Sequence, residues 1–282
     1  MVGEVPQAPC LAAPAAQRFL MRAMRGTAVA GALPIFDPSR IPMETPAVHP
    51  AVGEPRCLPG AFVVVSPHLD DAVFSCAGLL RAHPGSVVIT AYTGLPQAAD
   101  MSTDWDRRCG FPTAADAMAA RLAEDRLALA QVGCMGLGLG FVDSQYGEQP
   151  PDGQAQLADS LVRVLAGLGA DRVALPLGLF HDDHVRVSDA GLDASRACPG
   201  LSWFFYEDVP YRKRPGAVQA RLAQLRARGV VATPAPLKTD LAGKADAVSA
   251  YASQLRGLGG LPDAGAQAES YWRVAGGEEP RA

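Results

Sequence analysis

From residue 62 onward, the hydrophobic and polar positions of this 282-residue chain alternate between two kinds of segment. Short runs rich in β-branched and aromatic residues predict strands, and longer runs with apolar residues three or four apart predict helices. We expect strands at 62–65, 86–92, 137–142, 172–175 and 201–206, and helices at 71–82, 113–132, 155–168 and 185–196. This alternation predicts an α/β fold, a Rossmann-like layered sheet of mostly parallel strands with crossover helices.

The segments on either side of this pattern differ from it. Residues 1–55 are dense in proline, which breaks regular structure, so we expect an irregular N-terminal arm there. One domain is expected over 56–273, followed by a tail at 274–282. Two more helices are predicted at 215–228 and 241–258, separated by the connection Thr233-Pro234-Ala235-Pro236.

The longest predicted helix has clear capping and charge signals. Thr113 is suited to be its N-cap, with Asp116 three residues later. On the face opposite the apolar residues it carries Arg121, Glu124 and Asp125. The spacing of Arg121 and Asp125 predicts an ion pair one helical turn apart.

Composition and charge exclude several classes of function. The formal net charge is −4 without a basic stripe, so we expect neither nucleic acid nor an anionic membrane as partner. No apolar run is long enough to span a membrane or to serve as a secretory signal. Six scattered cysteines without a Cys-x-x-Cys motif indicate reduced thiols in the cytoplasm. No G-x-G-x-x-G or Walker loop supports a nucleotide cofactor, and the oligomeric state is not fixed by the sequence.

Candidate chemistry follows two of the predicted strands. His68, Asp70 and Asp71 come directly after the strand at 62–65, and His181 and His184 bracket two aspartates after the strand at 172–175. In open α/β sheets ligands bind beyond the carboxyl ends of the strands. The two motifs are therefore expected to form halves of one site.

Histidines and carboxylates in this arrangement are typical of a hydrolytic metal site. Such a site needs about three protein ligands and an open position, and a free carboxylate can accept the proton of the attacking water. Asp70 and Asp71 point in different directions, so one can bind the metal while the other acts as base. The alternatives are an acidic helix start that complements the dipole and a pair of ordinary surface or core histidines. Two such clusters at strand ends favour the metal site.

Several motifs resemble those of the PIG-L/LmbE-like superfamily of zinc-dependent N-deacetylases. The resemblance is carried by Ser66-Pro67-His68-Leu69-Asp70-Asp71-Ala72-Val73 and by His181-Asp182-Asp183-His184-Val185. Further blocks are Arg121 with Glu124 and Asp125, and the segments at 141–144, 206–211 and 244–254. The sequence departs from the common pattern at Leu69, Ala72 and Asp182, none of which is an implied ligand or base.

The resemblance implies a role for each motif residue. Zn²⁺ would be held by His68, Asp71 and His184, although the same nitrogen and oxygen ligands also accept Fe²⁺. Asp70 would be the general base, His181 would polarise the carbonyl or protonate the leaving amine, and Asp183 would orient a histidine. Sugar hydroxyls would be bound by Arg121 and Asp143 and, in the loop at 94–112, by Trp105 and Asp106.

The implied activity is removal of an acetyl or longer acyl group from the amide of a small-molecule amino-sugar conjugate. The alternatives are an amidase that acts on a thiol conjugate or an antibiotic scaffold, and a non-catalytic metal-binding or sugar-binding module. Trp105 is equally suited to fixing its loop on the core. We expect Glu207 and Asp208 to cap or position the last predicted strand rather than to face the site.

Overall fold

The computed structural model describes residues 56–260 and 267–275. The proline-rich arm predicted at 1–55 lies outside these residues, as do residues 276–282 of the predicted tail. In the described ranges, every helix is too short or too polar to cross a membrane.

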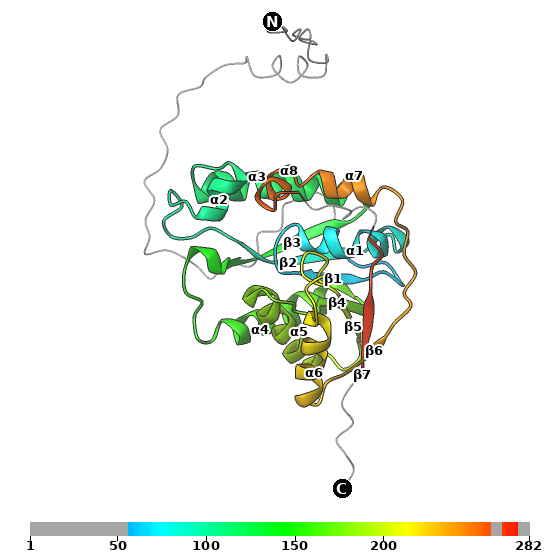
Figure 1. The fold of residues 1–282 in the computed structure, drawn as a ribbon. Coiled ribbons are helices and arrows are strands. Elements are labelled where there is room, and N and C mark those ends of the chain that lie inside the picture. Colours follow the sequence, from blue (N-terminus) through cyan, green and yellow to red (C-terminus); the bar gives the residue numbers. More distant parts are fainter. Residues whose placement is uncertain (1–55, 261–266, 276–282) are drawn as a thin grey trace, which may run out of the picture. The chain divides into compact units, whose positions relative to one another are not determined.

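A seven-stranded sheet forms the centre of the described chain (Figure 1). Its order is β3-β2-β1-β4-β5-β7-β6. The first five strands in this order are parallel, which confirms the predicted fold class. The strands are β1 (Val63–Ser66), β2 (Val87–Gly94), β3 (Met135–Val142), β4 (Arg172–Pro176), β5 (Ser202–Tyr206), β6 (Val231–Pro234) and β7 (Tyr271–Ala275).

Helices cover both faces of this sheet (Figure 1). Helices α1, α3, α7 and α8 lie over one face, and α4, α5 and α6 lie over the other. Their bounds are α1 (Asp71–Ala82), α2 (Asp104–Cys109), α3 (Ala114–Gln131), α4 (Gly153–Leu168), α5 (Asp182–Ala197), α6 (Ala217–Ala227), α7 (Lys244–Ser249) and α8 (Ala252–Gly257), with a short 3₁₀ helix η3 (Ser144–Tyr146).

The buried residues of β1 divide between two apolar clusters, one on each face. Val63 and Val65 pack with α4 and α5, whereas Val64 and the preceding residue Phe62 pack with α1 and α3. Alternate residues of a strand point to opposite faces, so a strand covered on both sides is apolar throughout. This explains the continuous apolar run that marked β1 in the sequence.

The prediction was wrong at the C-terminal side of the sheet. The segment around Pro234 was expected to be a plain connection, but β6 runs to Pro234 and pairs antiparallel with β7. β6 is an edge strand, and the edge is where a proline is tolerated in a sheet. β7 continues to Ala275, two residues into the predicted tail.

The helical predictions need three corrections. The loop expected at 94–112 contains α2, and the single helix expected at 241–258 is divided at Ala250 and Tyr251 into α7 and α8. Thr113 caps α3 as predicted, since its side chain accepts a hydrogen bond from the Asp116 N–H. Arg121 does not pair with Asp125, because each of them has another buried partner.

Candidate metal centre

The first half of the site is the turn between β1 and α1. Ser66 fixes this turn, because its Oγ donates to the carbonyl of His68 at 2.6 Å and accepts from the N–H of Ala72 at 3.0 Å. Asp71 in the first turn of α1 accepts the backbone N–H of His68 at 2.9 Å. His68, Asp70 and Asp71 are all buried there. The polar motif is therefore held rigidly at the carboxyl end of a core strand.

The second half of the site begins where the neighbouring strand β4 ends. β1 and β4 are paired in parallel, so their carboxyl ends point the same way. His181 is the N-cap of α5, and its Nδ1 accepts the N–H of Asp183 at 3.2 Å. His184 follows in the first helical turn and is completely buried. The two motifs thus meet at one edge of the sheet, as the sequence predicted.

Asp71 lies between the two histidines of the predicted ligand set. Its Oδ2 is 3.1 Å from Nδ1 of His68 and 3.1 Å from Nε2 of His184. Yet Nε2 of His184 is buried without a hydrogen-bond partner among the described residues. Two imidazole nitrogens and one carboxylate oxygen this close together, one of them unsatisfied, suit a divalent cation. His68, Asp71 and His184 therefore fit a metal ion.

A second carboxylate, other than that of Asp71, contacts the other ring nitrogen of each histidine. Nδ1 of His184 lies 2.6 Å from Oδ1 of Asp208, and Nε2 of His68 lies 3.3 Å from Oδ2 of Asp183. Such contacts fix the tautomer and the ring orientation of a metal-binding histidine. The orienting role of Asp183 stays a prediction, and its contact with His68 is compatible with that role.

Asp208 is the site residue that the sequence reading missed. It was expected only to position the strand end, and its Oδ2 does accept the N–H groups of Gly178 and Leu179 at 3.0 and 3.1 Å. Its other oxygen binds His184, however. The sequence signal that could have revealed Asp208 is its position as a carboxylate just after β5, the strand that pairs with β4.

Burial and neighbouring charges shift the titration of the site in opposite directions. Burial alone would lower the pKa of His184, but the carboxylates of Asp71 and Asp208 outweigh it and raise that pKa to about 9. Burial would raise the pKa of Asp71, yet His184 and His68 hold it well below its usual range. Positive charge is thus favoured between these three groups, where a cation would supply it.

Asp70 behaves differently from its neighbour Asp71. Burial and the adjacent charge of Asp71 raise the pKa of Asp70 to about 6. A carboxyl group with a pKa near neutrality suits proton transfer. The two adjacent carboxylates are therefore distinguished by environment, one suited to binding a cation and one to accepting a proton.

His181 lies beside the other two imidazoles. Its ring centroid is 5.4 Å from that of His68 and 5.5 Å from that of His184. Burial and these two histidines lower its pKa, which favours a neutral ring. With Nδ1 accepting from Asp183 N–H, the ring proton lies on Nε2, which can donate a hydrogen bond.

Arg121 and Asp143 adjoin this cluster. Nη1 of Arg121 lies 3.7 Å from Oδ2 of Asp143, which itself lies 3.6 Å from Nε2 of His68. Arg121 is buried, but its Nε and Nη1 have no hydrogen-bond partner among the described residues. These donors are free to bind oxygen atoms of a substrate.

Trp105 and Asp106 have partners within the protein. The indole of Trp105 donates to Gln254 at 3.1 Å. Asp106 closes the capping box of α2 and accepts the hydroxyl of Tyr146 at 3.0 Å. These contacts attach α2 to its surroundings, and binding of substrate by Trp105 and Asp106 stays a prediction.

Two aromatic residues not predicted for the site lie next to its histidines. The ring of Tyr211 is 5.1 Å from that of His184 and 5.6 Å from that of Phe180. Phe180 precedes His181, is 59% exposed and has φ of +65°, which L side chains rarely adopt. Tyr211 ends the 206–211 segment that contributes to the family resemblance, whereas Phe180 lies in no periodic or charged pattern that could reveal it in the sequence.

Comparison with known proteins finds similarity to deacetylases. Residues 63–195 match the family described as PIG-L: GlcNAc-PI de-N-acetylase. The 2'-N-acetylparomamine deacetylase of Streptomyces fradiae is 30% identical over 190 residues, which are 61% of this chain and 65% of that protein. The match thus spans slightly less than two thirds of this relative's length.

Solved structures share the fold. The zinc-inhibited form of teicoplanin deacetylase Orf2 matches with a TM-score of 0.65 and 24% identity, covering 78% of this chain and 99% of that one. The A40926 pseudoaglycone deacetylase Dbv21 matches with a TM-score of 0.59 and 23% identity, covering 76% and 97%. The chain is thus similar to the PIG-L family over residues 63–195, and it shares the fold of these solved deacetylase structures.

Proposed function

We propose that this protein is a metal-dependent N-deacetylase that hydrolyses the acetyl amide of an amino sugar carried on an antibiotic-type scaffold. The observation that carries the proposal is the Asp71 oxygen lying 3.1 Å from both His68 Nδ1 and His184 Nε2. The relative from Streptomyces fradiae, which acts on 2'-N-acetylparomamine, supports the substrate class. No observation favours a thiol conjugate.

In this proposal His68, Asp71 and His184 hold the divalent cation, Zn²⁺ or Fe²⁺. When bound, the cation would supply Lewis-acid polarisation of the amide carbonyl and make water more acidic. Asp70 takes the proton of the attacking water, in keeping with its pKa of about 6. The C–N bond then breaks, and this proton goes to the departing amine nitrogen, leaving acetate and a free amino sugar.

The remaining site residues stabilise and orient the reacting groups. His181 donates its Nε2 proton as a hydrogen bond to the carbonyl oxygen as negative charge develops there. Asp183 and Asp208 hold the rings of His68 and His184 in their observed orientations. Arg121 and Asp143 bind sugar hydroxyl groups beside the reacting amide.

The test combines metal content with amine release from 2'-N-acetylparomamine. We expect wild-type protein to bind one metal ion per chain, His184→Ala to lose it, and His83→Ala, a histidine outside both motifs, to retain it. Asp70→Asn should keep the metal and lose turnover. Metal should be titrated as Zn²⁺ and as Fe²⁺, because the teicoplanin relative has a zinc-inhibited form.

Each contrary outcome has a distinct meaning. Full activity of Asp70→Asn would refute the proposed base. Metal binding without hydrolysis of any acetylated amino sugar would favour the alternative of a non-catalytic binding module. The cytoplasmic location inferred from thiol usage stays a prediction, and fractionation of the producing cells tests it.

A further inference from the structure

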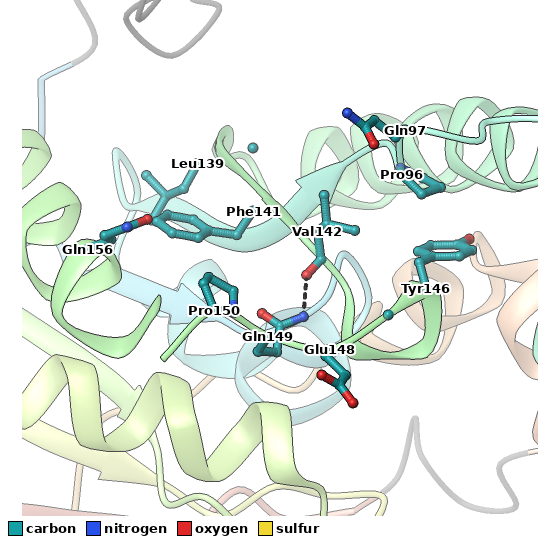
Figure 2. A pocket seen from close by; sticks show the side chains of 12 residues that line it. Pro96, Gln97, Leu139, Phe141, Val142, Tyr146, Glu148, Gln149, Pro150 and Gln156 are labelled. Carbon is teal, nitrogen blue, oxygen red and sulfur yellow. Dashed lines mark hydrogen bonds between the residues drawn. The ribbon is translucent and has the colours of Figure 1, made fainter. Parts of the chain in front are cut away.

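A groove of about 510 Å³ lies at the carboxyl end of the edge strand β3 (Figure 2). Its walls come from the segment after β2, the end of β3, the connection from η3 to α4, and the first turn of α4. None of the histidines of the metal centre lines it. Its volume is in the range of small-molecule sites, roughly 300–1,000 Å³.

One short segment of the chain has residues at both the groove and the metal centre. Val142 and Tyr146 line the groove, and between them lie Asp143 and Ser144. Asp143 lies 3.6 Å from Nε2 of His68, and the Ser144 hydroxyl donates to Asp183 at 2.8 Å. The same turn therefore borders the groove on one side and contacts the metal centre on the other.

The position of the groove sets the size of a ligand that would use both sites. Strand β2 separates β3 from β1, so their carboxyl ends lie two strand spacings, roughly 10 Å, apart. One sugar ring at the metal centre is too short to cover that distance. A ligand that fills the groove while its amide reacts must therefore carry a second ring.

The lining of the groove is mixed in polarity and has an acidic member. Phe141, Val142 and Pro96 offer apolar surfaces. Gln149 donates one amide N–H to the carbonyl of Val142 at 2.9 Å, and its side-chain oxygen remains available as an acceptor (Figure 2). Glu148 is exposed and has no ion-pair partner among the described residues. Lysine, arginine and histidine are absent from the lining, so the groove suits a ring with apolar faces and a positive charge.

We propose that this groove binds the second, ammonium-bearing ring of the substrate, with Glu148 facing the ammonium group. The inference rests on the proposed deacetylase function and adds to it that the substrate has at least two rings and is cationic. Recognition through one exposed ion pair predicts a modest, salt-dependent effect on substrate binding. It predicts no effect on the chemical step, because Glu148 does not contact the metal centre.

The experiment compares a one-ring and a two-ring substrate. Wild type, Glu148→Gln and Glu148→Lys are assayed with N-acetylglucosamine and with 2'-N-acetylparomamine, whose second ring carries amines. Asp159→Lys is the matched control, since Asp159 is an exposed acid of α4 that does not line the groove. We expect Glu148→Gln to raise KM about five-fold, and Glu148→Lys to raise it further, for the two-ring substrate only. kcat should be unchanged, and the difference should shrink as salt is added.

The experiment distinguishes a wrong assignment of the groove from a wrong assignment of the enzymatic activity. Equal effects on both substrates, or no effect on the two-ring one, would overturn the assignment of the groove. If wild type hydrolyses neither substrate, the proposed function is wrong. Calorimetry of paromamine binding at low salt then tests, without any reaction, whether the groove binds the ammonium-bearing ring. Weaker binding by Glu148→Lys than by Asp159→Lys would then support it, and equal binding would refute it.

Discussion

Replacing Asp208 by asparagine changes one carboxylate oxygen to an amide nitrogen at a point where three donors converge. Oδ1 faces Nδ1 of His184 at 2.6 Å, and Oδ2 accepts the N–H groups of Gly178 and Leu179. The asparagine oxygen can serve only one of these directions. If it stays with the two backbone groups, the new NH₂ group faces His184.

The consequence for His184 is a change of tautomer. Its Nδ1 must then accept a hydrogen bond, so the ring proton moves to Nε2, the nitrogen aimed at Asp71. A metal ion would have to displace that proton. Loss of such an orienting contact weakens metal binding about 10- to 100-fold, or about 1.4 to 2.7 kcal/mol. If the amide turns the other way, two backbone donors lose their acceptor, which costs stability by about 1–3 kcal/mol for each.

The assay is competition of wild type and Asp208→Asn with a chromophoric chelator for Zn²⁺, followed by thermal unfolding of the metal-free proteins. Asp189→Asn is the control, because Asp189 lies on α5 with His184 and its carboxylate binds Arg221 and Arg228 but no histidine. We expect only Asp208→Asn to lose metal affinity. Metal affinity equal to that of wild type, in a folded Asp208→Asn protein, would refute the orienting role.

Three further predictions concern stability. Asp125 accepts the hydroxyl of Tyr251, and burial raises its pKa to about 7, so the wild-type folded state loses stability as pH rises from about 4 to 7. In urea titrations, the free energy of unfolding of Asp125→Asn should therefore increase relative to that of wild type between pH 4 and 8. A difference that does not change with pH would contradict this. Gly178 has φ of +84°, and a Cβ atom there would lie 2.9 Å from the Cβ of Ser188. Gly178→Ala should therefore lower the free energy of unfolding by about 2 kcal/mol or more, and it should weaken metal binding by shifting the start of α5. Unfolding equal to that of wild type would show that the turn can adapt. At Phe180, with φ of +65°, glycine should be about 1 kcal/mol more stable than alanine by chemical denaturation, and the reverse order would mean that no strain is relieved.

Local sequence determined the parallel half of the fold and the main members of the site. The apolar run of β1 and the helical spacing of α1 are properties of neighbouring residues, so they can be read along the chain. The carboxyl ends of parallel strands meet at one edge, and this brought His68 and His184 together in the prediction. The resemblance of the motifs to the PIG-L/LmbE-like superfamily then implied different roles for Asp70 and Asp71, which spacing alone left open.

Only the tertiary structure decided the features that depend on partners far apart in sequence. β7 pairs with β5 and β6, and its few residues carry no strong pattern without those neighbours. Asp208 acquires its contact with His184 because β5 lies beside β4. Asp125 leaves its expected partner Arg121 because the junction between α7 and α8 presents the hydroxyl of Tyr251, 126 residues away along the chain. Local propensity is a property of the chain, but the partner of a buried polar group is set by whichever element packs against it.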